Sequence, residues 1–204
     1  SRRNRFLEKR YLDFLYFSFN HIMSSINLKL ASTESELIQI KKLQNQNLRE
    51  NLSINKSIEE GFLTAKYTLS YLKEINQKSP EIILKQKRVI GYALAVTPGV
   101  AKNHLLLNSL FTIFNKQIYN NQLIGNQSYI VVGQLCIDEN YRGMGYVEKL
   151  YSLFRETYSS YRYCITAIDS KNNRSKKAHE RCGFKKIGNL KLNKNPGDIV
   201  IWEW

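Results

Sequence analysis

A glycine-bearing turn separates an apolar run from a helical pattern in the second half of this chain. The run at residues 129–132 is β-like, and residues 134–147 follow it with Arg142, Gly143 and Gly145. Glycine lets a backbone approach a ligand closely, and the first N–H groups of a helix have no partners within the helix. Arg142 adds a permanent positive charge beside those N–H groups. The turn therefore predicts an anion-binding site that suits a diphosphate.

The helix expected after this turn is amphipathic. Its apolar residues recur at helical spacing on one face, while charged residues such as Glu148 and Arg155 fill the other face. The apolar face comprises Val147, Leu150, Tyr151, Phe154 and Tyr158. A strand, a glycine turn and a half-buried helix in this order place the first turn of the helix at the anion site.

Two segments resemble signatures of the GNAT superfamily of N-acetyltransferases. The first signature is the acetyl-CoA-binding motif Arg-x-x-Gly-x-Gly/Ala after a strand, which Arg142 and Gly145 match. Val147 departs from the family pattern, because small residues are usual at its position. The second signature is an Asn, a helix with an aromatic hydroxyl late in it and a Gly-Phe pair, which residues 172–184 resemble. The two signatures stand in the family's order with an expected strand between them.

The resemblance is close over residues 129–184 and loose over residues 26–204. It implies an α/β (α+β) fold with a central sheet that is mixed, mostly antiparallel and twisted. Helices flank this sheet, and acetyl-CoA binds at its splayed central strand. We expect the GNAT-like domain at residues 23–204. Residues 1–22 are basic and then aromatic, and we interpret them as an N-terminal extension upstream of a natural start at Met23. A partner-binding helix is the alternative for this extension.

Local patterns predict further elements without the resemblance. Alternation of apolar and polar residues at 26–30 predicts a strand, and Thr33 with Glu36 forms a capping box that starts a helix. Residues 81–96 predict a hairpin, and residues 105–118 predict a helix in an insertion before the central strand. Later strands are expected at residues 163–168, 184–187 and 198–204.

The composition is that of a basic globular protein. The 204 residues have a formal net charge of +14, and 43% of them are hydrophobic. This length and hydrophobic content fit one domain with a sizeable core. The charge invites a nucleic-acid interpretation, but Lys and Arg are scattered along the chain, which favours an ordinary solvated surface. Such a surface still attracts the polyanionic CoA over roughly 10 Å at 0.1 M salt.

Cysteine usage and hydropathy point to a reducing, aqueous compartment. Cys136, Cys164 and Cys182 are too few and too dispersed for a disulfide framework or a zinc site, so we expect buried free thiols and no bound metal. No segment approaches the ~20 apolar residues that a membrane span needs. We therefore expect a cytoplasmic protein that binds neither a membrane nor nucleic acid.

The resemblance implies that acetyl-CoA is the cofactor and assigns residues to it. The backbone at the end of the central strand pairs with the amide-rich pantetheine arm, and the glycine turn holds the diphosphate. Asn172 matches the family Asn that contacts the cofactor arm, and Ser175 lies on the same helix. The strand residues are Leu135, Cys136 and Ile137, and the turn residues are Arg142, Gly143, Met144, Gly145, Tyr146 and Val147.

His179 is the predicted catalytic residue. Aligned backward from Gly183 and Phe184, it occupies the place where many GNAT enzymes have Tyr, the proposed acid toward the leaving thiolate. Its ordinary pKa of ~6.5, against ~8.5 for a thiol, makes a protonated imidazole a competent donor. A histidine that only packs on its helix is the alternative. Gln134 sits where some relatives have an acidic residue and cannot take a proton, so water, or Glu203 through water, is left as base.

The acceptor is expected to be a primary amine of a small molecule or peptide. The candidate substrate-binding residues are Glu50, Asn51, Phe62, Gln134 and Glu203. For Glu50 and Asn51 the alternative is an ordinary exposed loop, and for Phe62 it is simple core packing. The sequence thus predicts an N-acetyltransferase that moves the acetyl group of acetyl-CoA directly to the amine. A non-catalytic acyl-CoA-binding regulatory module is the alternative function.

Overall fold

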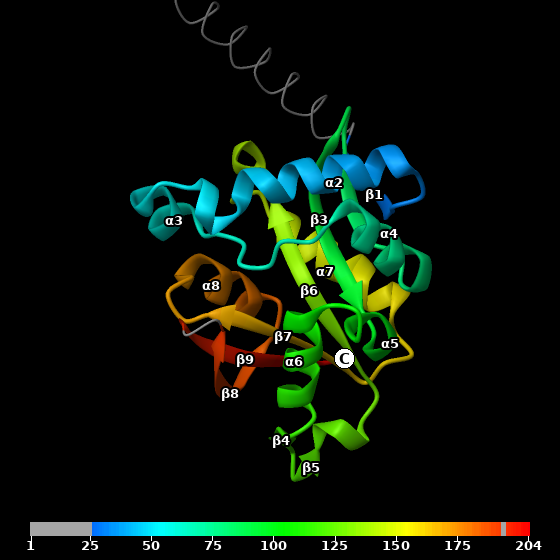
Figure 1. The fold of residues 1–204 in the computed structure, drawn as a ribbon, viewed down its shortest axis with the longest axis vertical. Coiled ribbons are helices and arrows are strands. Elements are labelled where there is room, and N and C mark those ends of the chain that lie inside the picture. Colours follow the sequence, from blue (N-terminus) through cyan, green and yellow to red (C-terminus); the bar gives the residue numbers. More distant parts are fainter. Residues whose placement is uncertain (1–25, 193–194) are drawn as a thin grey trace, which may run out of the picture.

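One mixed sheet organises the part of the chain that the computed structural model describes, residues 26–192 and 195–204. Its seven strands stand in the order β1-β2-β3-β6-β7-β9-β8 (Figure 1). β6 and β7 are parallel, and the other neighbouring pairs are antiparallel. The strands are β1 (Asn27–Leu30), β2 (Ile82–Lys85), β3 (Val89–Val96), β6 (Tyr129–Ile137), β7 (Tyr163–Asp169), β8 (Lys185–Leu192) and β9 (Asn195–Glu203). The predicted mixed, mostly antiparallel sheet is confirmed, whereas the predicted extension at residues 1–22 and the start at Met23 lie outside the described residues.

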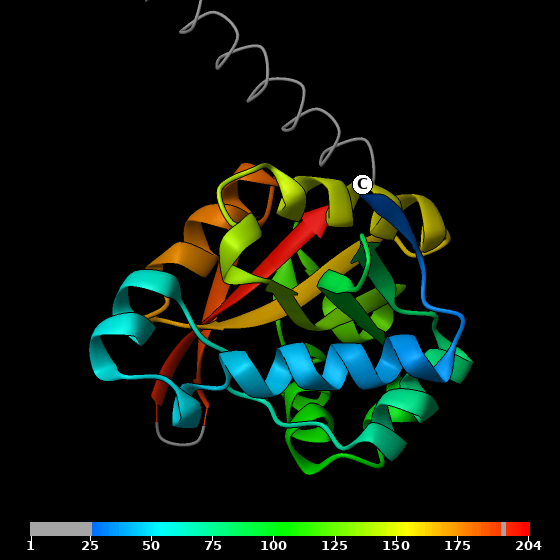
Figure 2. The ribbon, with the colours of Figure 1, turned by 90° about the horizontal axis from the view of Figure 1, so that it is seen from above.

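Helices cover both faces of this sheet. Figure 2 shows the sheet between α2 on one side and α7 on the other. α2 and α4 bury residues such as Ile40 and Leu72 against one face, and α7 buries Leu150 and Phe154 against the other. The helices are α2 (Glu34–Asn47), α3 (Ile54–Glu60), α4 (Leu69–Lys78), α5 (Pro98–Ala101), α6 (Leu105–Phe114), α7 (Tyr146–Thr157) and α8 (Asn173–Arg181), with 3-10 turns at Arg49–Asn51, Ile124–Asn126 and Glu139–Tyr141. Among the described residues, none of these helices has the length and apolar character that crossing a bilayer requires.

A buried carboxylate fixes the start of α2. The predicted capping box is confirmed, because the Thr33 side chain accepts from the Glu36 N–H and the Glu36 carboxylate accepts from the Thr33 N–H at 3.2 Å. Lys29 of β1 and Lys85 of β2 each donate to the same carboxylate at 2.8 Å. Burial alone would raise the Glu36 pKa, but these two lysine bonds outweigh it and hold the pKa far below its usual range. α2 is thereby tied to the first two strands.

A β-bulge at Gly133 lies where β6 and β7 diverge. Gln134 faces Leu94 and Val132 faces Ala95 on β3, so Gly133 is an extra residue in β6. A Cβ atom at Gly133 would lie 2.5 Å from a methyl carbon of Val96, so a larger residue would force the buried Val96 side chain to shift. The parallel pairing of β6 with β7 covers residues 129–131 and 163–165, and the two strands diverge beyond them. A gap therefore opens at the carboxyl ends of the two central strands.

An insertion between β3 and β6 adds a wall on the α2 side of the sheet. The predicted helix at residues 105–118 exists as α6 but ends at Phe114. A small hairpin follows, formed by β4 (Ile118–Tyr119) and β5 (Gln122–Leu123). Its turn residues Asn120 and Asn121 have φ of 49° and 59°, which asparagine tolerates better than other side chains. The helical prediction ran past Phe114 because the two-residue strands leave no alternating pattern to detect.

Glu81 is a fully buried carboxyl group just before β2. Its backbone is engaged, since its N–H donates to the Asn76 side chain and its carbonyl accepts from the Ala31 N–H. Neither carboxyl oxygen has a hydrogen-bond partner among the described residues. Burial raises the pKa of Glu81 to about 8, so the group is mostly protonated at neutral pH.

We predict that Glu81 makes the protein less stable as pH rises. The folded pKa of about 8 lies above the ordinary value of 4.5, so the native state holds more protons than the unfolded chain between these pH values. From pH 5 to pH 8 the parent should lose roughly 3 kcal/mol of unfolding free energy relative to Glu81→Gln, which cannot ionise. Denaturant titrations at both pH values measure this difference. Parallel pH profiles for parent and variant would contradict the buried, unpaired state.

Candidate functional site

The glycine turn adopts a backbone conformation that leaves a helix end uncovered. Gly143 and Gly145 have φ of 78° and 75°, in the left-handed region, and Gly145 is the N-cap of α7. Gly145 has no side chain that could cap this helix, so no oxygen from the N-cap residue's side chain covers its first turn. A Cβ atom on either glycine would meet nothing within 4 Å. These positions therefore need glycine for the backbone conformation and not for lack of space.

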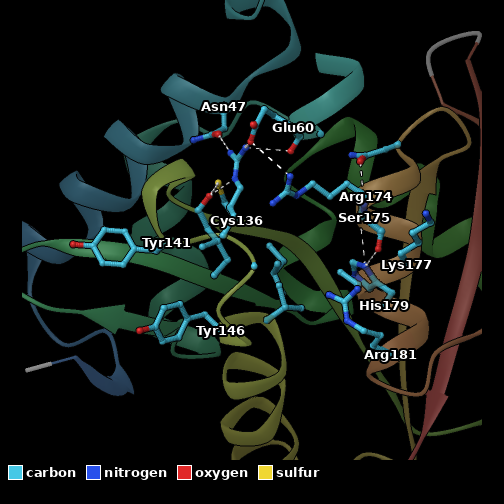
Figure 3. Close-up of a pocket in the computed structure, with 18 of the residues that line it drawn as sticks. Asn47, Glu60, Cys136, Tyr141, Tyr146, Arg174, Ser175, Lys177, His179 and Arg181 are labelled. Carbon is cyan, nitrogen blue, oxygen red and sulfur yellow. Dashed lines mark hydrogen bonds and ion pairs between the residues drawn. The ribbon is translucent and has the colours of Figure 1, made fainter. Parts of the chain in front are cut away.

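A large cavity lies in front of this helix end. Its volume is about 630 Å³, and Figure 3 shows side chains from the turn, from α3 and from α8 around it. The predicted cofactor residues that line it are Leu135, Cys136, Ile137, Arg142, Gly143, Gly145, Tyr146, Val147, Asn172 and Ser175. Met144 differs from the others, because it does not line the cavity and the residue is 41% exposed.

The end of β6 presents backbone groups to the gap. The Asp138 N–H donates to the Ile90 carbonyl of β3, so alternation along the strand turns the backbone of Leu135 and Ile137 to the other edge. On that edge the Ile137 carbonyl accepts from Arg142 Nε at 3.0 Å. Leu135 faces the gap beyond the parallel pairing, where this edge of β6 has no partner strand. An extended, amide-bearing ligand has an open strand edge to pair with here.

Arg142 differs from the free cation that the sequence suggested. Its Nη1 donates to the Glu60 carboxylate at 2.6 Å and to the Glu60 carbonyl at 3.1 Å. Its Nη2 donates to the Asn47 side chain, and only 12% of the Arg142 side chain is exposed. The guanidinium therefore joins β6, α2 and α3, and the turn's backbone N–H groups remain as its main anion donors.

A short strap crosses the gap between the turn and α8. It consists of residues 60–63, and Arg142 holds its first residue through Glu60. At the other side, Asn172 Nδ2 donates to the Phe62 carbonyl at 3.0 Å while Asn172 Oδ1 accepts from the Ser175 N–H at 3.1 Å. Gly61, with φ of 77°, passes so close that a Cβ atom would lie 2.9 Å from Asn172 Oδ1. One asparagine thus caps α8 and fixes the strap.

A second, smaller cavity opens on the α2 and α6 side of the gap. Its volume is about 100 Å³, and Tyr67, Leu106 and Leu110 form part of its wall. It shares six lining residues with the first cavity: Phe62, Leu63, Leu135, Asn172, Ser175 and His179. The two cavities therefore meet where β6 and β7 diverge.

Polar groups in the second cavity are held firmly. Gln134 accepts from the Tyr92 hydroxyl at 2.7 Å and from Gln44 at 3.0 Å, and it donates to the Ala65 carbonyl at 2.7 Å. Gln134 therefore fixes the cavity wall.

Asp169 is the carboxylate that lines this cavity, and its side chain is 2% exposed. It accepts from the Lys171 N–H at 2.9 Å and forms a long ion pair with Arg49 at 3.3 Å, which leaves an oxygen with spare acceptor capacity.

His179 borders both cavities and is 6% exposed. Tyr151 and Phe184 pack against its ring, and its Nδ1 lies 2.8 Å from the Ser175 carbonyl. A carbonyl only accepts, so Nδ1 bears the proton and Nε2 presents a lone pair. Burial lowers the pKa of His179 to about 4, against the partial compensation of the Ser175 bond. The imidazolium considered from the sequence is therefore not the resting form at neutral pH.

Three predicted substrate residues lie away from the cavities. Glu50 pairs with Lys66 at 2.7 Å, and Asn51 donates to the Asn45 carbonyl; both are exposed in the loop after α2. Glu203 pairs with Arg162 at 3.1 Å, beside the start of β7. β9 is antiparallel to β7, so its last residues meet the end of β7 opposite the gap. Neither Glu203 nor the two loop residues line the cavities, in contrast to Phe62 and Gln134.

The cysteines are thiols in this environment. Burial raises the pKa of Cys136 to about 12 and that of Cys182 to about 11. The pKa of Cys164 also lies well above its usual value because the side chain is buried. A thiol is a poor nucleophile compared with its thiolate, so the site has no activated cysteine to accept an acyl group.

Sequence reasoning missed several charged residues of the site. Glu60 ends α3 and Asp169 ends β7, and nothing near either residue in the sequence indicates its partner in the site. Arg174, Lys177 and Arg181 had a usable signal, because positions i, i+3 and i+7 fall on one side of a helix. All three line the large cavity.

Solved structures share this fold. A NatC complex bound to Gag peptide and CoA matches with a TM-score of 0.61 and 15% identity, over 88% of this chain and 99% of that chain. A GNAT-family acetyltransferase from Streptococcus agalactiae matches with a TM-score of 0.61 and 13% identity, over 88% and 95%. A putative acetyltransferase from Salmonella typhimurium, solved with acetyl-CoA, matches with a TM-score of 0.58 and 12% identity, over 88% and 94%.

The sequence itself identifies the family. No curated protein sequence matches the chain. The family model described as the acetyltransferase (GNAT) family matches residues 48–184, more than half of the chain. This match covers the strap, the glycine turn and α8, and the cavity, strand edge and uncapped helix fit acetyl-CoA as the donor. The chain belongs to the acetyltransferase (GNAT) family and is an acetyl-CoA-dependent acyltransferase.

Proposed function

We propose that this enzyme transfers the acetyl group of acetyl-CoA directly to a primary amine of a small molecule or peptide. The main support for this proposal is that the two cavities meet at the β6–β7 gap. A donor in the large cavity and an amine in the small one approach each other at the six shared residues. Holding both reactants in one geometry removes much of the entropic barrier to a bimolecular reaction.

The chain's own groups orient the donor. Acetyl-CoA supplies an acetyl thioester when bound. We assign the diphosphate to the backbone N–H groups around Gly145 at the uncapped end of α7, where the helix dipole favours negative charge. We assign the pantetheine arm to the open edge of β6 at Leu135 and Ile137. Cys136, Tyr146 and Val147 form the walls between these two contacts.

Direct transfer is favoured over a covalent acyl-enzyme. The cysteine that lines the large cavity, Cys136, is a buried thiol with a raised pKa. Cys182 and Cys164 are likewise protonated. Without a thiolate, the chain offers no activated sulfur for an intermediate acylation.

The acceptor cavity suits an amine on a small, partly apolar group. Phe62, Leu106 and Leu110 supply apolar surface, and a volume of about 100 Å³ admits the reacting end of a larger molecule. Asp169 attracts the ammonium form, because its carboxylate is almost fully buried and keeps spare acceptor capacity. Peptide amines remain in this class, as a NatC complex binds a Gag peptide and Arabidopsis NAA60 binds a bisubstrate analogue on the same fold.

His179 is our candidate for the proton transfer. Its Nδ1–H is held by the Ser175 carbonyl, so Nε2 is the acceptor that remains. The attacking nitrogen becomes more acidic as it bonds to carbon, which lets a weak base take its proton. The imidazolium formed has a low pKa and passes the same proton to the departing sulfur. One neutral histidine on the border of both cavities would thus act as base and then as acid.

A non-catalytic acyl-CoA-binding module is the alternative. Gln134 favours it, because this residue stands where some relatives have an acidic group and its amide is held in three hydrogen bonds to the protein. Such a module would bind acetyl-CoA without releasing CoA in the presence of amines.

Free-thiol detection with an amine panel separates these functions. We predict acetyl-CoA turnover with monoamines or short peptides, at higher kcat/KM than with spermine. The net charge of +14 disfavours polycations around the site at low salt. Acetyl-CoA binding without thiol release for any amine would favour the regulatory module. A higher kcat/KM for spermine than for simple amines would reject the acceptor class.

Gly145→Glu tests the cofactor site. The new carboxylate would meet the diphosphate at the end of α7, so the stabilisation by acetyl-CoA, about 2.7 kcal/mol at a concentration 100-fold above Kd, should vanish. Thermal unfolding with and without acetyl-CoA measures this stabilisation as a shift in Tm.

Gly145→Ala controls for left-handed strain, which costs about 1–2 kcal/mol, and should keep most of the Tm shift. Gly99→Glu, where a Cβ meets nothing within 4 Å, controls for added charge. A full shift in Gly145→Glu would disprove the assignment.

Substitution of His179 tests the proton transfer. His179→Phe keeps an aromatic ring against Tyr151 and Phe184, so acetyl-CoA affinity should stay within a few-fold while kcat falls by about 10²–10⁴-fold. His179→Tyr should retain part of the activity. Because the pKa of His179 is about 4, the parent should show no fall in kcat from imidazole deprotonation between pH 6 and pH 9. Near-native kcat in both variants would reduce His179 to a packing residue.

A further inference from the structure

Three cations form one edge of α8 along the large cavity. Arg174, Lys177 and Arg181 line it at positions i, i+3 and i+7 of the helix. Figure 3 shows them along α8, across the cavity from Tyr141 and Tyr146. The other cavity-facing edge of α8 consists of Ser175 and His179, which also border the small cavity. α8 therefore presents a neutral edge toward the reacting centre and a cationic edge away from it.

The cavity has more cations than its carboxylates neutralise. Four cationic side chains line it, Arg142 and the three of α8, against the carboxylates of Glu60 and Glu148. Glu60 pairs with Arg142 at 2.6 Å and lies farther from Arg174, at 3.8 Å. Glu148 pairs with Arg181 at 3.0 Å. Lys177 has no carboxylate partner among the described residues. Four cations less two carboxylates leave two positive charges, at Arg174 and Lys177.

We propose that Arg174 and Lys177 bind the 3′-phosphate on the ribose of CoA. The cofactor's diphosphate suits the uncapped end of α7, and its uncharged arm suits the strand edge of β6. The remaining charged group of CoA is the 3′-phosphate monoester, with a charge near −2 at neutral pH. The two unneutralised cations stand in the same cavity, on the edge of α8 farther from the reacting centre.

This site makes the enzyme discriminate between CoA and 3′-dephospho-CoA. The two ligands share the arm and the diphosphate, so their affinities differ only through the 3′-phosphate. A charge-assisted contact to a phosphate is worth at least about tenfold in affinity. Lys177→Gln should remove most of this preference, because no described carboxylate pairs with Lys177 and its loss leaves none of these carboxylates unpaired. Arg174→Gln should reduce it further.

Calorimetric titration of CoA and 3′-dephospho-CoA into the purified protein tests the proposal without any turnover. At about 50 mM salt, where screening is weak, the parent should bind CoA at least about tenfold more tightly. In Lys177→Gln the ratio of the two Kd values should approach one, while the Kd for 3′-dephospho-CoA changes by less than about threefold. Lys102→Gln removes an exposed lysine that lines neither cavity, and it should keep the parent ratio.

Two results would overturn the assignment. Equal affinity of the parent for both ligands would mean that no residue contributes binding energy through the 3′-phosphate. An unchanged ratio in both Lys177→Gln and the double variant with Arg174→Gln would place the phosphate elsewhere. Because the readout is binding of two CoA forms, neither result depends on the acceptor amine or on His179.

Discussion

The Arg142 guanidinium joins three segments that are far apart in the sequence. It donates to the end of β6 at Ile137, to the end of α2 at Asn47 and to the end of α3 at Glu60. Only 12% of this side chain is exposed. Loss of these contacts would leave a buried charge without a partner, which is strongly unfavourable. The strap at residues 60–63 is thereby fixed beside the glycine turn. Both cavities depend on the strap, since Phe62 lines each of them.

The bulge at Gly133 lies where β6 borders the two cavities that we propose for the two reactants. Before it, β6 pairs on both edges; beyond it, one edge faces the gap. Leu135 consequently borders the large cavity and the small one. The parallel partner β7 ends at Asp169, so a carboxylate stands at the acceptor side of the same gap. A single register shift thus lies beside both the strand edge that we propose for the cofactor and the cavity that we propose for the acceptor.

Features that depend on local chemistry were predictable from the sequence. The capping box at Thr33 and the helix after Gly145 follow from short patterns, and the mixed, mostly antiparallel sheet follows from the family resemblance. Features that depend on distant partners were not. Arg142 was expected to add its positive charge to the anion site, because nothing near it in the sequence indicates a contact with Glu60, 82 residues earlier. Glu203 was placed at the site although the antiparallel pairing of β9 with β7 takes it to the opposite end.

Burial changes chemistry that residue type alone suggests. His179 is neutral at physiological pH and donates through Nδ1, so it can take part in proton transfer only through the lone pair on Nε2.

The positive charge of the chain is unevenly distributed along the sequence. Residues 171–192 contain eight Lys and Arg against one Glu, a net +7 within the chain's total of +14. Arg174, Lys177 and Arg181 contribute to this excess and line a cavity that suits a polyanionic cofactor.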